Sequence, residues 1–181
     1  MRFLQEDTVL VVIDVQEKLF PHISENGFLK RKLEIIIKGF KGLEVPIMYT
    51  QQYTKGLGET IKAIQDLSIW EFQPIEKMAF SCVDEINFVK ALGSMNKKNV
   101  VLVGIETHVC VMQTAIDLLS LSYNVMVVED CVSSRKDEDK QIALKRMASE
   151  GVKIGSYESI LLELCRYSGT DTFKQISQLI K

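Results

Sequence analysis

The 181-residue sequence lacks the patterns that mark many metal-binding or nucleic-acid-binding proteins. It contains two histidines, and neither a His-x-His nor a His-Glu-x-x-His spacing occurs, so no metal site is expected. Its four cysteines include no Cys-x-x-Cys pair, which argues against a zinc ribbon or a thioredoxin-type motif. The formal net charge is -2 without any basic block, so neither nucleic acid nor a membrane surface is an expected partner.

Long hydrophobic runs are also missing. The apolar run at residues 9–13 is too short for the apolar region of a signal peptide, and Asp14 follows it at once. No stretch has the length of a membrane-spanning helix. We therefore expect a cytoplasmic protein whose thiols stay reduced. Three of them are expected to be small buried apolar residues, namely Cys82, Cys131 and Cys165.

The remaining composition is that of an ordinary globular domain. Hydrophobic residues make up 46% of the sequence and charged residues 25%. A chain of this length fits one domain, which we expect to span residues 1–181. Gly56-x-Gly58 lacks the third glycine and the strand–helix context of a dinucleotide-binding loop, and no cofactor is expected.

Short runs rich in β-branched residues alternate with segments of helical spacing. Continuous apolar runs are typical of strands buried on both faces of a parallel sheet. Their alternation with helices predicts an α/β fold, a doubly wound parallel sheet with helices on both faces. The predicted strands are 8–13, 46–50, 99–103, 124–128 and 152–154, with a weaker one near 73–76, and the predicted helices are 28–43, 83–92, 109–121, 140–148, 157–164 and 172–180.

Residues 51–70 form the longest stretch without a clear element. Ligands in doubly wound folds bind beyond the carboxyl ends of the strands. Two glycines in this stretch, at 56 and 58, indicate an ordered loop over that edge of the sheet, where loops often shape a site. The candidate substrate-binding residues are Gln16, Phe20, Gln51 and Tyr53.

Cys110 falls in the first turn of the helix predicted after strand 99–103. Unpaired backbone N–H groups and the helix dipole favour an anion there, so we expect a lowered pKa for the thiol. The same N–H groups could hold the oxyanion of a tetrahedral intermediate. Taken alone, the position fits a small buried apolar residue equally well.

Two other residues gain meaning only beside Cys110. Asp14 follows a buried strand and would project into the ligand crevice, although a capping role fits as well. Lys77 follows the weak strand, and a lone lysine is usually a solvated surface residue. Next to a thiol, the carboxylate could accept its proton and the cation would stabilise the thiolate. His108 is a poor candidate for the base, because it points to another helix face than Cys110, so we expect it at a pocket edge or an interface.

Together these three positions resemble the isochorismatase-like cysteine hydrolases. The pattern of that family has an acid after the first strand (VVIDVQ), a lysine after the third (IEKMAFS) and a Gly-x-x-Thr-x-x-Cys turn (GIETHVCV). The resemblance continues through NVMVVEDCVSSR and KRMASEG, and so covers nearly the whole chain. The QYTKGLG segment is similar to the subgroup of "isochorismatase domain-containing" proteins.

The resemblance implies a role for each position. Cys110 would be the nucleophile, Asp14 would take its proton and later pass it to the leaving group, and Lys77 would hold the charge of both. A six-stranded parallel sheet and assembly into dimers or larger oligomers are implied as well. The same likeness implies a cis peptide bond between Ile105 and Glu106, and an oxyanion hole formed by the N–H groups of Glu106 and Cys110.

One departure from the family pattern bears on the substrate. Nicotinamidases of the family carry an Asp-x-His metal motif after the second strand, whereas residues 49–53 here read YTQQY. A metal-anchored pyridine substrate is therefore not expected. Three functions remain open: hydrolysis of a small amide or related C–N bond, a silent binding or interaction protein of the same fold, and a thiol-redox protein that uses Cys110.

Overall fold

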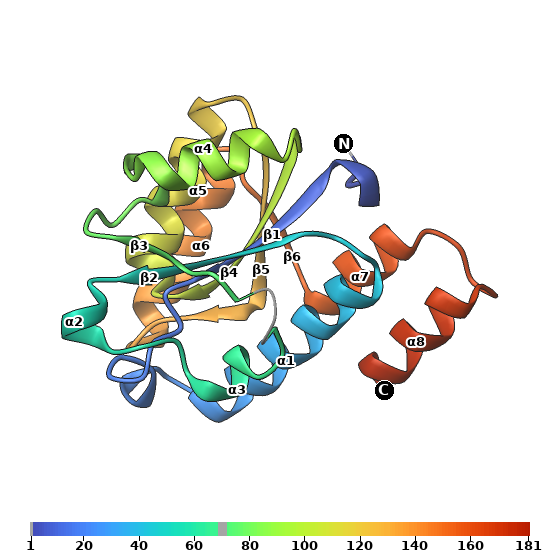
Figure 1. Cartoon of the computed structure of the whole chain (residues 1–181), viewed down its shortest axis with the longest axis horizontal. Coiled ribbons are helices and arrows are strands. Elements are labelled where there is room, and N and C mark those ends of the chain that lie inside the picture. Colours follow the sequence, from blue (N-terminus) through green and yellow to red (C-terminus); the bar gives the residue numbers. More distant parts are fainter. Residues whose placement is uncertain (1, 69–71) are drawn as a thin grey trace.

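Six parallel strands form one sheet in the order β3-β2-β1-β4-β5-β6 (Figure 1). The structure, a computed structural model, describes residues 2–68 and 72–181. The chain builds the sheet outward from β1 to β3 and then from β4 to β6, so the order reverses between β1 and β4. The strands are β1 (Thr8–Ile13), β2 (Ile47–Gln52), β3 (Ile75–Lys77), β4 (Asn99–Ile105), β5 (Asn124–Ser133) and β6 (Lys153–Gly155).

Helices cover both faces of this sheet (Figure 1). On one face α1, α7 and α8 pack together, and on the other lie α4, α5 and α6. The doubly wound fold predicted from the sequence is therefore confirmed. The helices are α1 (Asn26–Gly42), α2 (Thr54–Leu57), α3 (Lys62–Gln65), α4 (Ile86–Ser94), α5 (Met112–Ser120), α6 (Asp137–Ser149), α7 (Tyr157–Cys165) and α8 (Asp171–Ile180).

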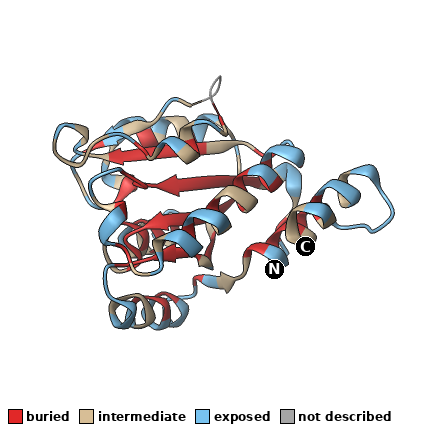
Figure 2. Cartoon of the chain, turned by 90° about the horizontal axis from the view of Figure 1, so that it is seen from below, coloured by how far each residue is buried: buried red, intermediate tan, exposed pale blue. Residues whose placement is uncertain are grey.

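The central strands are buried on both sides, as Figure 2 shows by their colour. Successive side chains of a strand point to opposite faces, so β1 sends Leu10 and Val12 into the α1 core and Val11 and Ile13 into the α5 core. This explains the continuous apolar run of the strand, since neither face reaches water.

Two predicted regions on the β2 and β3 side of the sheet differ from the structure. The stretch 51–70 is not a loop throughout: β2 extends to Gln52, and α2 and α3 follow, while residues 69 and 70 lie outside the described residues. The helix predicted at 83–92 begins at Ile86, where the Glu85 side chain accepts a hydrogen bond from the backbone N–H of Asn87. A 3₁₀ turn over Cys82–Asp84 precedes it.

Candidate active site

The point where the strand order reverses places two chemically important segments side by side. Ile13 of β1 pairs with Gly104 of β4, and the chain after each strand enters the same crevice. Gly104 has φ 115°, and a Cβ there would lie 2.1 Å from the carbonyl oxygen of Ile13. Glycine is therefore required for this close approach. Asp14 then turns away with φ 52°, in the left-handed region.

A buried ion pair lies at the end of β1. The Lys77 Nζ atom is 2.6 Å from Oδ2 of Asp14, and the side chains are 0% and 2% exposed, respectively. The other carboxylate oxygen, Oδ1, accepts a hydrogen bond from the Thr50 hydroxyl at 2.8 Å. One oxygen of the Asp14 carboxylate is thus held by Lys77 of β3, and the other by Thr50 of the neighbouring strand β2.

Lys77 is fixed by a ring of acceptors. Besides Asp14, its ammonium group donates to Oε1 of Gln52 at 2.7 Å and to the carbonyl oxygens of Ala79 at 3.2 Å and Phe80 at 3.1 Å. Burial acts to lower the pKa of Lys77, but the charge of Asp14 opposes it and the net pKa is raised. Lys77 is therefore a charged group in a buried position, not the solvated lysine that its sequence context alone would predict.

Cys110 lies in a π-helical turn, Thr107–Val111, that joins β4 to α5. Its side chain is buried, and the charges of Asp14 and Lys77 both act on its thiol. Burial raises the pKa of the Cys110 thiol, the Asp14 carboxylate raises it further, and Lys77 opposes them without reversing the shift. The lowered pKa expected from the helix start is wrong, because burial and Asp14 outweigh the effect of a positive neighbour.

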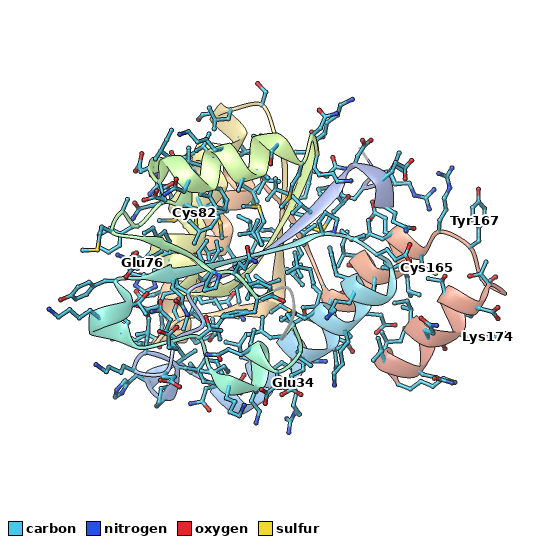
Figure 3. The ribbon with its side chains drawn as sticks, in the orientation of Figure 1. Glu34, Glu76, Cys82, Cys165, Tyr167 and Lys174 are labelled. Atoms are coloured by element: carbon cyan, nitrogen blue, oxygen red, sulfur yellow. The ribbon has the colours of Figure 1, made fainter. Side chains whose placement is uncertain are left out.

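A second buried thiol, that of Cys82, lies near Cys110. Cys82 is fully buried on the α4 side of the sheet (Figure 3), where its backbone N–H donates to Thr114 Oγ1 at 2.9 Å. Burial raises the pKa of Cys82 to about 11, with a further contribution from Asp14. Cys131 is also buried, whereas Cys165 is partly exposed at the α7–α8 end of the molecule (Figure 3). The expected burial thus holds for Cys82 and Cys131, and Cys165 departs from it.

A cavity of about 270 Å³ opens over the Cys110 thiol. Asp14, Glu106 and Cys110 line it, so the structure brings the predicted chemical residues to one opening. The peptide bond between Ile105 and Glu106 is cis, as the family resemblance implies. The remaining lining residues, which the sequence reasoning did not name, are Leu19, Gln52, Leu57, Phe80, Ile105, Val109 and Arg135.

The four residues proposed for substrate binding lie elsewhere. Gln16 is buried and its amide pairs with the backbone of Gln52, accepting from N at 2.7 Å and donating to O at 3.0 Å. The Gln51 amide donates to Glu59 and Thr60.

The other two are also outside the cavity lining. Phe20 belongs to the core on the α1 face. Tyr53 is exposed and borders a separate, open hollow along β3. The residue types near the carboxyl edge show which side chains are polar or large, but not which of them point into the cavity. The same edge rule did not reach Arg135, because the strand was predicted to end at residue 128 and β5 runs to Ser133.

Two charged contacts border the site. The Glu106 carboxylate accepts from the Arg135 backbone N–H at 3.0 Å and from its Nε at 3.1 Å. His108 Nδ1 lies 2.9 Å from the Ser134 hydroxyl, and its Nε2 lies 3.9 Å from Asp139, so it faces α6. His108 is not among the residues of the cavity wall, which agrees with its rejection as the base.

Neither a metal-binding cluster nor a membrane-spanning helix occurs in the described part of the chain. It holds no group of three or more His, Cys, Asp or Glu residues that could bind a metal ion. Among the described helices, none has the length and apolar character needed to cross a membrane.

Comparison with known proteins identifies the family. Residues 8–159 match the model of the Isochorismatase domain. The chain belongs to the isochorismatase family. It is 36% identical over 181 residues to isochorismatase domain-containing protein 2A of Mus musculus, which covers 99% of this chain and 85% of the relative.

Solved structures of the same fold agree with this assignment. A Caenorhabditis elegans protein described as MAR1 ribonuclease superposes with a TM-score of 0.93 at 34% identity, covering 99% of this chain and 92% of that chain. The Escherichia coli YcaC gene product, described as an octameric hydrolase of unknown specificity, gives a TM-score of 0.93 at 21% identity over 99% of this chain and 89% of that one. The isochorismatase-family hydrolase fold supports a hydrolase role.

Proposed function

We propose that this protein is a cysteine-dependent hydrolase that cleaves an amide or related C–N bond of a small molecule through an acyl-enzyme on Cys110. The observation that carries the proposal is the buried Asp14–Lys77 pair, 2.6 Å apart, beside a thiol that faces a cavity. Burying two charges is costly, and such a pair next to a nucleophile is characteristic of catalytic sites.

Acylation would begin with proton transfer from the Cys110 thiol to Asp14. The sulfur attacks the carbonyl carbon of the substrate, a C–S bond forms, and the carbonyl oxygen becomes an oxyanion. The backbone N–H groups of Glu106 and Cys110 would donate to that oxyanion. When the tetrahedral intermediate collapses, the C–N bond breaks and Asp14 gives its proton to the leaving nitrogen. The products of this half-reaction are a neutral amine or ammonia and a thioester.

Deacylation would use the same carboxylate in the opposite order. A water molecule attacks the thioester carbon while Asp14 removes one of its protons. The C–S bond breaks, the thiolate takes the proton from Asp14, and a carboxylic acid leaves. Both half-reactions then need only one group that accepts and returns a proton, and the raised pKa of Cys110 makes that acceptor necessary.

Lys77 would act through its charge and not as a proton donor. Its three N–H bonds face four acceptor oxygens of the protein, on Asp14, Gln52, Ala79 and Phe80. Its raised pKa keeps the ammonium charged, so it can stabilise a transient thiolate beside it. The proton of the leaving group must therefore come from Asp14.

The substrate class follows from the size and lining of the cavity. A volume of about 270 Å³ admits a small molecule. Five of the lining residues are apolar, namely Leu19, Leu57, Phe80, Ile105 and Val109. Such a cavity favours a compact substrate with an apolar portion, held where polar groups converge at one end.

The test is capture of the acyl-enzyme with a library of small amides. We expect the wild-type protein and the Cys165→Ala control to gain the mass of the acyl group on Cys110 and to release the acid. Cys110→Ala should do neither, as intact-protein and peptide mass spectrometry would show. Turnover by Cys110→Ala, or an adduct confined to another thiol, would contradict the proposal.

A ribonuclease activity is the alternative raised by the name of the Caenorhabditis elegans relative. RNA binding usually rests on many phosphate contacts by Lys and Arg. Here the formal net charge is -2, and Arg135 at the cavity is paired with Glu106. We therefore expect no Cys110-dependent cleavage when the protein is incubated with RNA, with gel electrophoresis as the readout.

The proposal also covers metal dependence, cellular location and oligomeric state. We expect turnover to persist in EDTA, since proton transfer and charge stabilisation are supplied by Asp14 and Lys77. A cytoplasmic location is expected for an enzyme with a reduced nucleophilic thiol. We further expect a dimer or a larger homo-oligomer, which light scattering coupled to size-exclusion chromatography would measure.

A further inference from the structure

The hydroxyl group of Thr50 is the second anchor of the Asp14 carboxylate. Thr50 and Asp14 are each 1% exposed, and the Oγ1–Oδ1 distance is 2.8 Å. A backbone bond joins the same two residues, from Asp14 N–H to Thr50 O at 3.2 Å. The register of β1 and β2, in which Ile13 pairs with Thr50, places the hydroxyl beside the carboxylate.

The direction of this hydrogen bond is settled by its chemistry. A carboxylate only accepts, so the single hydroxyl proton of Thr50 is committed to Oδ1 of Asp14. The thiol of Cys82 approaches the Thr50 oxygen at 4.0 Å as a donor. The Thr50 hydroxyl therefore directs its proton to Asp14 and a lone pair to Cys82.

Two donors then determine how Asp14 is oriented. Lys77 holds Oδ2 at 2.6 Å from β3, and Thr50 holds Oδ1 from β2. The groups that face Asp14 from the other packed elements are the thiols of Cys110 and Cys82. With both oxygens anchored, the carboxylate keeps a fixed position relative to the Cys110 sulfur.

We propose that Thr50 is the positioning residue of Asp14, whose hydroxyl keeps the carboxylate aimed so that it can accept the Cys110 proton. This inference rests on the proposed function of Asp14 as proton acceptor. A merely structural role for the same hydroxyl predicts only a loss of stability. A positioning role predicts in addition that the Cys110 thiol reacts more slowly.

The experiment measures the rate at which iodoacetamide alkylates Cys110 between pH 5 and pH 9, by peptide mass spectrometry. Thr50→Val removes the hydroxyl at nearly constant volume, and Thr50→Ser keeps it. Thr8→Val is the matched control, because Thr8 is also fully buried and donates one hydrogen bond, to Leu4 O, away from the site. Unfolding curves of all variants report stability separately.

We expect Thr50→Val to alkylate Cys110 several-fold more slowly than wild type across this pH range, because a carboxylate without its second anchor can turn away from the thiol. Thr50→Ser and Thr8→Val should keep the wild-type profile. If Thr50→Val does not fold, Thr50→Ala compared with Thr50→Ser carries the same test.

A wild-type profile for Thr50→Val, or a profile for Thr50→Ser that matches the valine variant, would overturn the proposal. This readout needs no substrate, so it is independent of the amide screen. Failure to find turnover or an acyl adduct would contradict the hydrolase function, while an unchanged alkylation profile would contradict the role of Thr50 alone.

Discussion

Two ion pairs, each with at least one member that lines the cavity, differ in their surroundings. Lys77 and Asp14 lie 2.6 Å apart with side chains 0% and 2% exposed, whereas Arg135 and Glu106 lie 3.1 Å apart with side chains 59% and 8% exposed. Charge attraction is screened strongly where water reaches one partner and weakly where it reaches neither. The first pair therefore governs the electrostatics of the thiol, and the second contributes mainly at the cavity mouth.

The largest effect is expected from breaking the buried pair. Lys77→Met leaves the Asp14 charge buried without its cation, which should lower the free energy of unfolding by about 3–5 kcal/mol and abolish turnover. Urea unfolding would measure the loss. Combining it with Asp14→Asn should recover part of the stability, because neither charge is then left unpaired. It should recover no activity, because the proposed proton acceptor is missing. A Lys77→Met protein as stable as wild type would show that the pair carries little energy.

The same contrast should appear in the reactivity of Cys110. Asp14→Asn removes the proposed proton acceptor and should slow acylation of Cys110 by an amide substrate on the order of 10²-fold. Glu106→Gln, at the half-exposed pair, should change it little. The Cys165→Ala background keeps the partly exposed thiol from consuming reagent. Equal rates for the two acid variants would remove the distinction between the pairs.

Alkaline pH tests the buried side of the comparison further. The pKa of Cys82 is raised from 9.0 to about 11, so the unfolded chain loses this proton first as the pH rises. The free energy of unfolding should therefore fall between about pH 9 and pH 11, by about 2–3 kcal/mol from this thiol. The raised pKa values of Cys110, Cys131 and Lys77 act in the same direction. Cys82→Ala should flatten the decline in part, and an unchanged slope would be contrary to this account.

The sequence predicts the fold well, but it does not predict where every strand ends. The apolar run of β1 predicted Thr8–Ile13 without error, because both faces of that strand are buried. β5 was predicted to end at Val128, where Glu129 and Asp130 interrupt the apolar pattern. Pairing resumes beyond a register shift, with Gly104 opposite Val132, and only the neighbouring strand reveals that continuation.

The site was predictable where position alone carries the chemistry. Asp14 and Cys110 follow β1 and β4, Lys77 ends β3, and the structure brings the three together at one edge of the sheet. Gln16 and Gln51 lie near that edge as well, but their amides are used by the backbone of Gln52 and by neighbouring side chains. The sign of the Cys110 pKa shift depended on burial depth, which a sequence does not display.

The smallest effect is expected at the half-exposed pair. Arg135→Ala removes a side chain that is 59% exposed, and Glu106 keeps the hydrogen bond from the backbone N–H of residue 135 at 3.0 Å. An exposed ion pair contributes about 0–1 kcal/mol, so urea unfolding should show a change of no more than about 1 kcal/mol, and less in high salt. Because Arg135 lines the cavity, any larger consequence should appear in KM for the substrate. Arg135→Lys, which keeps the charge, is the matched variant for that comparison. A loss of stability as large as that of Lys77→Met would mean that depth of burial does not separate the two pairs.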